Sequence, residues 1–157
     1  QFFTQLKNLI SNELDLRKLQ NFERRLLHNA ETNNNQRKYT IYDTDLMNGI
    51  QFENFIALVF KMKGYSTMVT PASGDQGIDV IAEKDNERIG IQAKRYVNAV
   101  TNTAIQEVVA GCSHYKCNKG IVVTNNIFTK SAISLAESND IILWDRQKLT
   151  SIINDLV

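Results

Sequence analysis

The feature that most constrains the fold is a pair of β-strand patterns joined by the turn-forming residues Asp85 and Asn86. The run Ile78–Lys84 contains consecutive β-forming and small apolar residues, and the run Arg88–Tyr96 alternates polar and apolar side chains. Aspartate followed by asparagine suits a two-residue hairpin turn. We therefore expect the two runs to form an antiparallel hairpin within a β-sheet.

The turn determines which residues face each other across this hairpin. With Lys84 paired to Glu87, counting back along both strands sets Asp79 opposite Gln92. Lys94 then points to the same face as Gln92, because side chains alternate along a strand. The hairpin thus brings a carboxylate, an amide and an ammonium group together, and a register shift of one residue would separate them.

Helix and strand patterns on both sides of the hairpin predict an α/β fold. A helix is expected to start at Asp43-Thr44-Asp45 and to end near Gly64, where its apolar stripe stops. The other expected elements are a strand over Tyr65–Thr70, a helix over about Asn102–Tyr115, a strand over Gly120–Thr124, a helix over Lys130–Ser138, a strand over Ile141–Asp145 and a closing helix through Leu156. The order αβββαβαβα implies a mixed central β-sheet flanked by helices.

An N-terminal helical arm is expected before this unit. Apolar residues at roughly helical spacing over Phe2–Leu27, with basic residues between them, predict an amphipathic helix, and the polar run Glu31–Lys38 interrupts the pattern. We divide the chain into an arm and linker over residues 1–42 and a main domain over residues 43–157. The apolar side of the arm needs a surface, either on the main domain, on a partner or on a second copy in a homodimer. A solvated basic face is favoured over one that holds DNA.

The composition is that of a globular domain. The 157 residues are 43% hydrophobic and carry a formal net charge of +1, which fits one domain. DNA binding must therefore rest on where the charges lie. No stretch approaches the roughly 18 apolar residues of a membrane span and no signal peptide is visible, so we expect a cytoplasmic protein. The chain begins at Gln1 without a methionine, which leaves room for a missing upstream segment.

The two cysteines are expected to be structural thiols. Cys112 and Cys117 lie five residues apart in a segment with a helical pattern, where such side chains point in different directions. We therefore expect no disulfide between them, and no Cys/His spacing of the zinc type occurs.

The side chains that the hairpin brings together suit the hydrolysis of a phosphodiester bond. This reaction needs a hard cation to hold the phosphate and activate water, and it gains from a positive group. Asp79 would offer a carboxylate, Gln92 its side-chain carbonyl and Ala93 its backbone carbonyl to Mg²⁺ or Mn²⁺, and Lys94 would supply the positive group. Glu53, on the helix before the strands, would add a second carboxylate. Polar residues that interrupt an apolar strand are typical of functional sites.

A glycine-containing loop precedes Asp79. Gly74 and Gly77 bracket Asp75, an arrangement that allows the backbone to bend closely around a ligand. The candidates for contacts with the substrate in this loop are Ser73, Gly74, Asp75 and Gln76.

The order of these motifs resembles the catalytic domain of Mrr-type restriction endonucleases. The matching segments are Phe52-Glu53, Gly64-Tyr65, Ser73 through Val80, Gln92-Ala93-Lys94-Arg95-Tyr96, Gln106-Glu107 with Ala110-Gly111, Val123-Thr124-Asn125 with Phe128-Thr129, and Leu149. That family has the PD-(D/E)xK restriction-endonuclease-like fold, with glutamine in place of the usual acid in its third motif. The resemblance implies that Asp79 and Gln92 are metal-site residues, that Lys94 is the catalytic lysine and that Glu53 is the helix acid.

The leading hypothesis is a metal-dependent endodeoxyribonuclease that acts in restriction or phage defence. Gln92 brings no charge to the metal site, so a catalytically inactive DNA-binding module of the same fold is the main alternative. Archaeal Holliday junction resolvases have similar Ser-Gly and Asp motifs, which support Ser73 as a phosphate contact and leave a resolvase-like nuclease as a third alternative. The first 45 residues are too short and too helical for a winged-helix module, so we do not extend methylation-dependent recognition to this chain.

Overall fold

The structure is a computed structural model that describes residues 40–71, 74 and 76–156. These residues belong to one compact unit that extends over 39–157. The expected N-terminal helix, the polar linker, Ser73 and Asp75 lie outside the described residues. The predictions made for them therefore stay predictions.

The described part alternates helices and strands in the expected order, with one additional short helix at its start. The helices are α2 (Ile41–Asp45), α3 (Gly49–Met62), α4 (Asn102–Tyr115), α5 (Lys130–Ser138) and α6 (Arg146–Asp155). The strands are β1 (Ser66–Val69), β2 (Val80–Lys84), β3 (Glu87–Lys94), β4 (Lys119–Thr124) and β5 (Ile141–Trp144). They form one sheet in the order β1-β2-β3-β4-β5, in which β1, β2 and β3 are antiparallel and β3, β4 and β5 are parallel. This mixed sheet confirms the predicted fold class.

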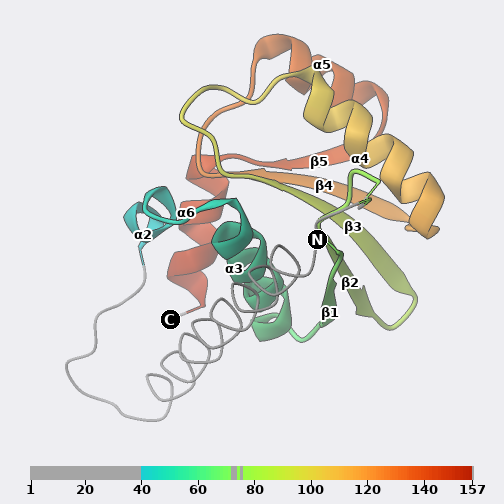
Figure 1. Cartoon of the computed structure of the whole chain (residues 1–157), viewed down its shortest axis with the longest axis horizontal. Helices are drawn as coiled ribbons and strands as arrows, with labels where there is room; N and C mark the ends of the chain where they lie inside the picture. The colour runs from blue at the N-terminus through green and yellow to red at the C-terminus, as the bar shows by residue number, and fades with distance from the viewer. Residues whose placement is uncertain (1–39, 72–73, 75, 157) are drawn as a thin grey trace, which may run out of the picture. The chain divides into compact units, whose positions relative to one another are not determined.

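Helices cover both faces of the sheet. On one face α4 packs on β3 and β4, and α5 packs on β5 and on α4. On the other face α3 packs on β1, β2 and β3, and α6 packs on β4 and β5. Figure 1 shows this layered arrangement, with the hairpin of β2 and β3 between α3 and α4.

Apolar side chains fill both interfaces between sheet and helices. Ile81 of β2, Val108 of α4 and Ala132 of α5 belong to the core beneath α4 and α5. On the opposite face the ring of Phe60 stacks on Trp144, with ring centroids 5.0 Å apart. Each large apolar side chain buried in this way contributes about 1.5–3 kcal/mol to folding. The hairpin is therefore held between two packed layers.

The helix predicted to start at Asp43 is two helices, because a capping residue begins a second one. The side chain of Asn48 accepts a hydrogen bond from the backbone N–H of Gln51 at 2.8 Å, and the Gln51 side chain accepts one from the backbone N–H of Asn48 at 2.9 Å. This reciprocal capping box starts α3 at Gly49. The first of the two helices, α2, begins at Ile41, so the predicted boundary between residues 42 and 43 lies within this helix.

The bounds of α4 and α5 are those predicted, whereas the other elements differ by one or two residues at their ends. The predicted strands starting at Ile78 and ending at Tyr96 instead start at Val80 and end at Lys94. The second difference has a clear cause, since the backbone N–H of Tyr96 donates to the side chain of Asn125 at 2.9 Å rather than to a neighbouring strand.

The two thiols lie closer together than predicted. Both are free, but Lys116 adopts a left-handed conformation with φ of 56° that ends α4 and turns the chain back at Cys117. Burial, together with the charge and hydrogen bonding of Cys117, raises the pKa of the Cys112 thiol to about 11. The expectation that the two side chains point in different directions was wrong, because Cys117 lies beyond the helix.

None of the helices in the part of the chain that the structure describes is long and apolar enough to cross a membrane.

Candidate active site

The predicted register of the hairpin is confirmed. Lys84 pairs with Glu87, and the ladder continues to Val80 opposite Ile91. The backbone N–H of Asp79 extends it by donating to the carbonyl oxygen of Ile91 at 2.9 Å. Asp79 therefore enters the site at the end of β2 that lies away from the turn.

The Asp79 carboxylate is held by the opposite strand. Its Oδ2 accepts hydrogen bonds from Gln92 Nε2 at 2.8 Å and from the backbone N–H of Ala93 at 2.7 Å. Only 5% of Asp79 and 3% of Gln92 are exposed. Hydrogen bonds to a charged group are the stronger kind and are worth about 1.5–3 kcal/mol each. They fix the carboxylate in one orientation.

The carbonyl oxygen of the Gln92 side chain has no such partner. Since Nε2 is committed to Asp79, Oε1 is set on the other side of the amide, where it is buried and accepts no hydrogen bond in the described structure. Leaving a buried acceptor unsatisfied costs about 1–3 kcal/mol. A buried polar group of this kind is expected where a ligand completes the site.

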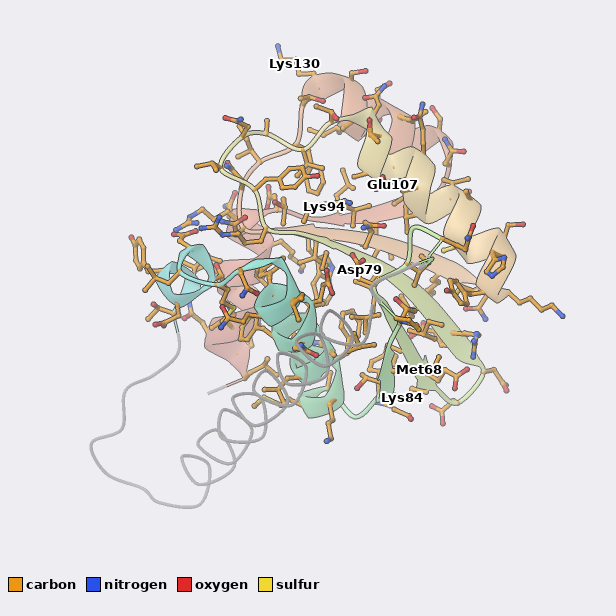
Figure 2. The ribbon with its side chains drawn as sticks, in the orientation of Figure 1. Met68, Asp79, Lys84, Lys94, Glu107 and Lys130 are labelled. Atoms are coloured by element: carbon orange, nitrogen blue, oxygen red, sulfur yellow. The ribbon has the colours of Figure 1, made fainter. Side chains whose placement is uncertain are left out.

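Lys94 lies on the same face of β3 as Gln92 and forms an ion pair across to α4. Its Nζ is 2.9 Å from Oε2 of Glu107. Burial by itself lowers the pKa of the Lys94 ammonium, but the hydrogen bond and charge of Glu107, with weaker effects of Tyr96 and Asp79, outweigh burial and raise it. Lys94 is thus a stable cation. Figure 2 shows Asp79, Lys94 and Glu107 near one another between the sheet and α4, with Lys84 at the far end of the hairpin.

Two glycines allow the loop that carries Asp79 to pack directly on α4. Gly77 has φ of +81°, and a Cβ atom there would lie 2.4 Å from the backbone oxygen of Glu107. A Cβ atom on Gly111 would lie 2.5 Å from the backbone oxygen of Gln76. The sequence predicted that glycine allows close approach to a ligand, whereas at Gly77 the close neighbour is a helix of the same domain.

A polar network holds the segment that follows Lys94. Arg146 makes two hydrogen bonds of 2.8 Å to the Asp45 carboxylate, and Asn125 donates to the same carboxylate at 2.9 Å. Asn125 in turn accepts the backbone N–H of Tyr96. The hydrogen bond from Arg146 outweighs the effect of burial and lowers the pKa of Asp45. The network ties α2 and α6 to the end of β3.

The other predicted site residues lie on α3 and in the loop before β2. Glu53 is half-buried on α3, the helix on the opposite face of the sheet, and Gly74 and Gln76 are exposed. No three histidine, cysteine, aspartate or glutamate side chains of the described residues are grouped closely enough to hold a metal ion. The roles assigned to Glu53, to the Ala93 carbonyl and to the loop residues remain predictions.

Glu107 is the residue that sequence reasoning missed. It belongs to one of the segments that carry the family resemblance, but a helical pattern alone does not tell which strand end a polar residue approaches. Gly77 and Gly111 were the available signal, because paired small residues permit a loop and a helix to pack closely.

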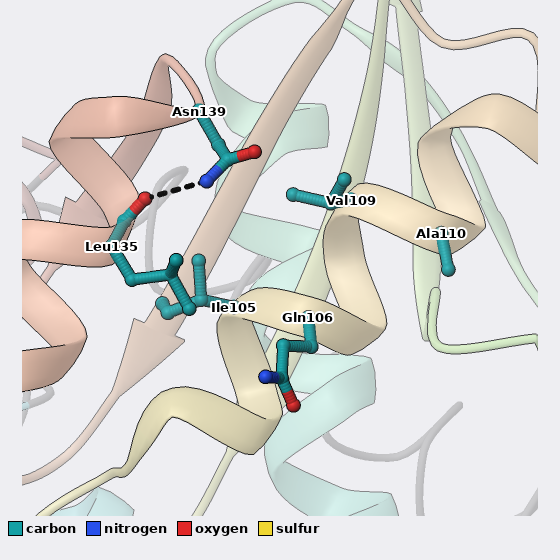
Figure 3. A pocket seen from close by; sticks show the side chains of 6 residues that line it. All are labelled: Ile105, Gln106, Val109, Ala110, Leu135 and Asn139. Atoms are coloured by element: carbon teal, nitrogen blue, oxygen red, sulfur yellow. Dashed lines mark hydrogen bonds between the residues drawn. The ribbon is translucent and has the colours of Figure 1, made fainter.

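An apolar hollow of about 260 Å³ between α4 and α5 lies outside this group. Figure 3 shows its lining residues, which are Ile105, Gln106, Val109, Ala110, Leu135 and Asn139. None of them is ionisable, so the hollow offers none of the chemistry found around Asp79.

The mixed five-stranded sheet with helices on both faces is a restriction-endonuclease-like fold. The sequence matches the model of the Mrr catalytic domain, which is described as a restriction endonuclease, over residues 44–153. The chain belongs to the Mrr family of restriction endonucleases.

Relatives of known identity agree with this assignment. The type IV methyl-directed restriction enzyme EcoKMrr of Escherichia coli strain K12 is 31% identical over 81 residues, which cover 49% of this chain and 27% of that enzyme. The chain therefore corresponds to about a quarter of the length of this curated relative.

Solved structures share the fold. The DNA modification-dependent restriction endonuclease AspBHI matches with a TM-score of 0.54 at 19% identity, over 66% of this chain and 30% of that one. AF1548, a protein of unknown function, matches with a TM-score of 0.52 at 22% identity, over 61% of this chain and 56% of that one.

Proposed function

We propose that this domain is the cutting part of a divalent-metal-dependent endodeoxyribonuclease. The observation that carries the proposal is the buried, unpartnered Oε1 of Gln92, set beside the fixed carboxylate of Asp79 and two residues before Lys94. Membership of a restriction endonuclease family supports DNA as the substrate.

The donor set fits Mg²⁺ or Mn²⁺. Asp79 offers a carboxylate and Gln92 a carbonyl oxygen, and hard divalent cations prefer oxygen ligands of both kinds. The carbonyl oxygen of Ala93 is the third candidate ligand. A bound cation would satisfy Gln92 Oε1, whose burial without a partner is otherwise unfavourable.

The roles of the side chains follow from their charges. A divalent cation at this site would supply Lewis-acid activation of water and of the phosphate. Asp79 would bind and orient it, held in place by Gln92 Nε2 and the Ala93 N–H. Lys94 remains protonated, so it would stabilise negative charge on the phosphate and orient the attacking water by hydrogen bonding rather than act as a general base. Glu53 is proposed as the helix acid.

A DNA-binding module that does not cut DNA is the second candidate. It is favoured by the absence of any group of three metal-ligating acidic, cysteine or histidine side chains among the described residues. Gln92 brings no charge, so Asp79 would be the anionic ligand that the hairpin supplies. Weak metal binding is expected under either proposal.

The proposed cellular role is restriction or phage defence in the cytoplasm. EcoKMrr is described as a restriction enzyme and AspBHI as a restriction endonuclease, which supports restriction as this role. Methylated and branched DNA belong among the substrates tested, because recognition of modified or branched DNA is not assigned to this chain.

A nuclease assay with two substitutions tests the proposal. Linear, supercoiled, methylated and branched DNA would be incubated with Mg²⁺ or Mn²⁺ and wild-type protein, Asp79→Asn or Lys94→Ala. The matched control is Lys148→Ala, which removes an exposed lysine from α6. We expect metal-dependent cutting by the wild type and the control, and a strongly reduced residual rate in both site variants.

The two candidates give different results in this assay. DNA binding without cleavage under every metal tried would reject the nuclease and support the binding module. Cutting by Lys94→Ala at the wild-type rate would show that the site is wrongly assigned. Thermal unfolding of each variant excludes loss of the fold as the cause.

A further inference from the structure

Glu107 reaches the site from α4, a different element from those that carry Asp79 and Lys94. Its Oε2 lies 2.9 Å from Lys94 Nζ. In the described structure this oxygen is buried, and its recorded contact is the ion pair with Lys94 rather than a hydrogen bond. Side-chain exposure is 17% for Lys94 and 39% for Glu107. The ion pair is therefore partly shielded, a setting in which charges interact more strongly than on an open surface.

The backbone of Glu107 is fixed against the loop that leads to Asp79. The virtual Cβ atom of Gly77 lies 2.4 Å from the Glu107 backbone oxygen and 3.0 Å from its Cβ atom. Gly111, one turn further along α4, is equally close to the loop at Gln76. The distance between the loop and α4 is thus set by close backbone packing. The backbone of Glu107 is therefore held in place, and its carboxylate in turn restricts the position of the Lys94 ammonium group.

The ion pair between Glu107 and Lys94 also changes the net charge of the site. Asp79 is anionic, Gln92 is neutral and Lys94 is cationic, so these three groups alone have no net negative charge. Glu107 restores one. Its carboxylate contacts the ammonium group on one side and leaves N–H donors for a phosphate oxygen and a water molecule.

We propose that Glu107 is a positioning residue that holds the Lys94 ammonium beside the Asp79–Gln92 pair in the orientation that DNA cleavage requires. This inference rests on the proposed nuclease function. Glu107 acts through Lys94 and need not touch DNA or metal. A merely structural ion pair would affect the stability of the domain without a specific effect on the turnover step.

The test combines cleavage kinetics with a direct observation of the lysine. Glu107→Gln retains the size of the side chain and removes its charge, and Glu107→Asp retains the charge on a shorter side chain. The matched control is Glu137→Gln, on the exposed surface of α5. Each variant would be made alone, and Glu107→Gln would also be combined with Lys94→Ala. The ¹⁵N ammonium signal of Lys94 would be recorded by NMR and assigned by its loss in Lys94→Ala.

We expect Glu107→Gln to lower kcat about tenfold, in the middle of the range of couplings between contacting residues, with KM changed less than about threefold. We expect the ion pair to slow proton exchange of the Lys94 ammonium in the wild type, so that its signal is visible there and in Glu137→Gln and disappears in Glu107→Gln. Glu107→Asp should recover part of the lost rate. In the Lys94→Ala background the added Glu107→Gln change should have no further effect on the residual rate, because its target is already absent.

Three outcomes would overturn the inference. Wild-type kcat in Glu107→Gln would show that the ion pair does not serve the reaction, whether or not the Lys94 signal changes. A retained Lys94 signal with reduced kcat would show that Glu107 acts by another route, such as direct metal binding. A wild-type protein that cuts no DNA would reject the proposed function and this inference with it, and that result would be known before any Glu107 variant is compared.

Discussion

The buried contact between Asp79 and Gln92 makes Gln92→Glu the most informative substitution. In the wild type, Gln92 Nε2 donates to Asp79 Oδ2 at 2.8 Å. Glutamate would replace this donor with a second carboxylate oxygen at a position that is 3% exposed. The exchange removes a favourable hydrogen bond and sets two negative charges against each other. It also adds the charge that a divalent cation would neutralise.

The cost can be worked out from the distance. Two unit charges about 3–4 Å apart repel by roughly 4–6 kcal/mol at an effective dielectric constant of about 20. Protonating one carboxyl group avoids this repulsion at a cost of about 4 kcal/mol at pH 7, and the resulting O–H can donate to Asp79. We therefore expect the metal-free variant to lose about 2–4 kcal/mol of stability. For a domain of this size the loss lowers Tm by roughly 8–15 °C.

Divalent metal should offset part of this loss of stability. A site with two carboxylates attracts a cation more strongly, and tenfold tighter binding adds about 1.4 kcal/mol of stabilisation at saturating metal. Thermal unfolding with EDTA and with millimolar Mg²⁺ or Mn²⁺ would measure both quantities. Gln147→Glu, at an exposed position of α6, is the matched control and should stay within about 0.5 kcal/mol of the wild type in either condition.

Two results would refute the reasoning. Wild-type stability of Gln92→Glu without metal would mean that the two side chains are not in buried contact. If the variant is destabilised but metal stabilises it no more than it stabilises the wild type, the result supports the Asp79–Gln92 hydrogen bond and rejects this pair as a metal site. Cleavage rate is a separate matter, since added negative charge can displace the water that Lys94 orients.

Two further predictions concern the supports of the site. Gly111→Ala should lower the free energy of unfolding, measured with denaturant, by about 1–2 kcal/mol and also slow cleavage, because its methyl group would lie 2.5 Å from the Gln76 oxygen. Gly49→Ala, where the added methyl group has no atom within 4 Å, should leave stability unchanged. Equal stability of the two variants would contradict the close packing at Gly111. Asp45→Asn should lower stability by about 0.5–1 kcal/mol at pH 7, a modest figure because the Asp45 side chain is 37% exposed. Arg146 lowers the pKa of Asp45 in the folded state, so the ion pair contributes fully to stability above the ordinary aspartate pKa and its contribution is lost as the pH falls through the lowered pKa. The stabilities of Asp45→Asn and the wild type should therefore converge in acid. A difference that persists in acid would mean that the ion pair is not its source.

The hairpin and its register could be predicted from residues that are neighbours along the chain. Asp85 and Asn86 supply the turn, and with Lys84 paired to Glu87 the period-two alternation of a strand places Asp79 opposite Gln92. Local rules of this kind depend on neighbours along the chain. The bounds of α4 and α5 and the α/β class were predictable for the same reason, because hydrophobic periodicity is a local property.

The groups that surround Lys94 depend on packing between elements that are distant along the chain. A loop and part of α4 separate Lys94 from Glu107 in the sequence. Their 2.9 Å contact depends on how closely the loop at Gly77 approaches α4. The rotation of a helix against a sheet is set by packing across the whole core, which no short pattern encodes. The same limit applies to Cys117. The left-handed conformation of Lys116 turns the chain so that the Cys117 side chain lies close to Cys112. The limit also explains Gln92, whose Nε2 donates to Asp79 while its Oε1 is buried without a hydrogen-bond partner in the described structure, because helices cover both faces of the sheet and exclude water from β3.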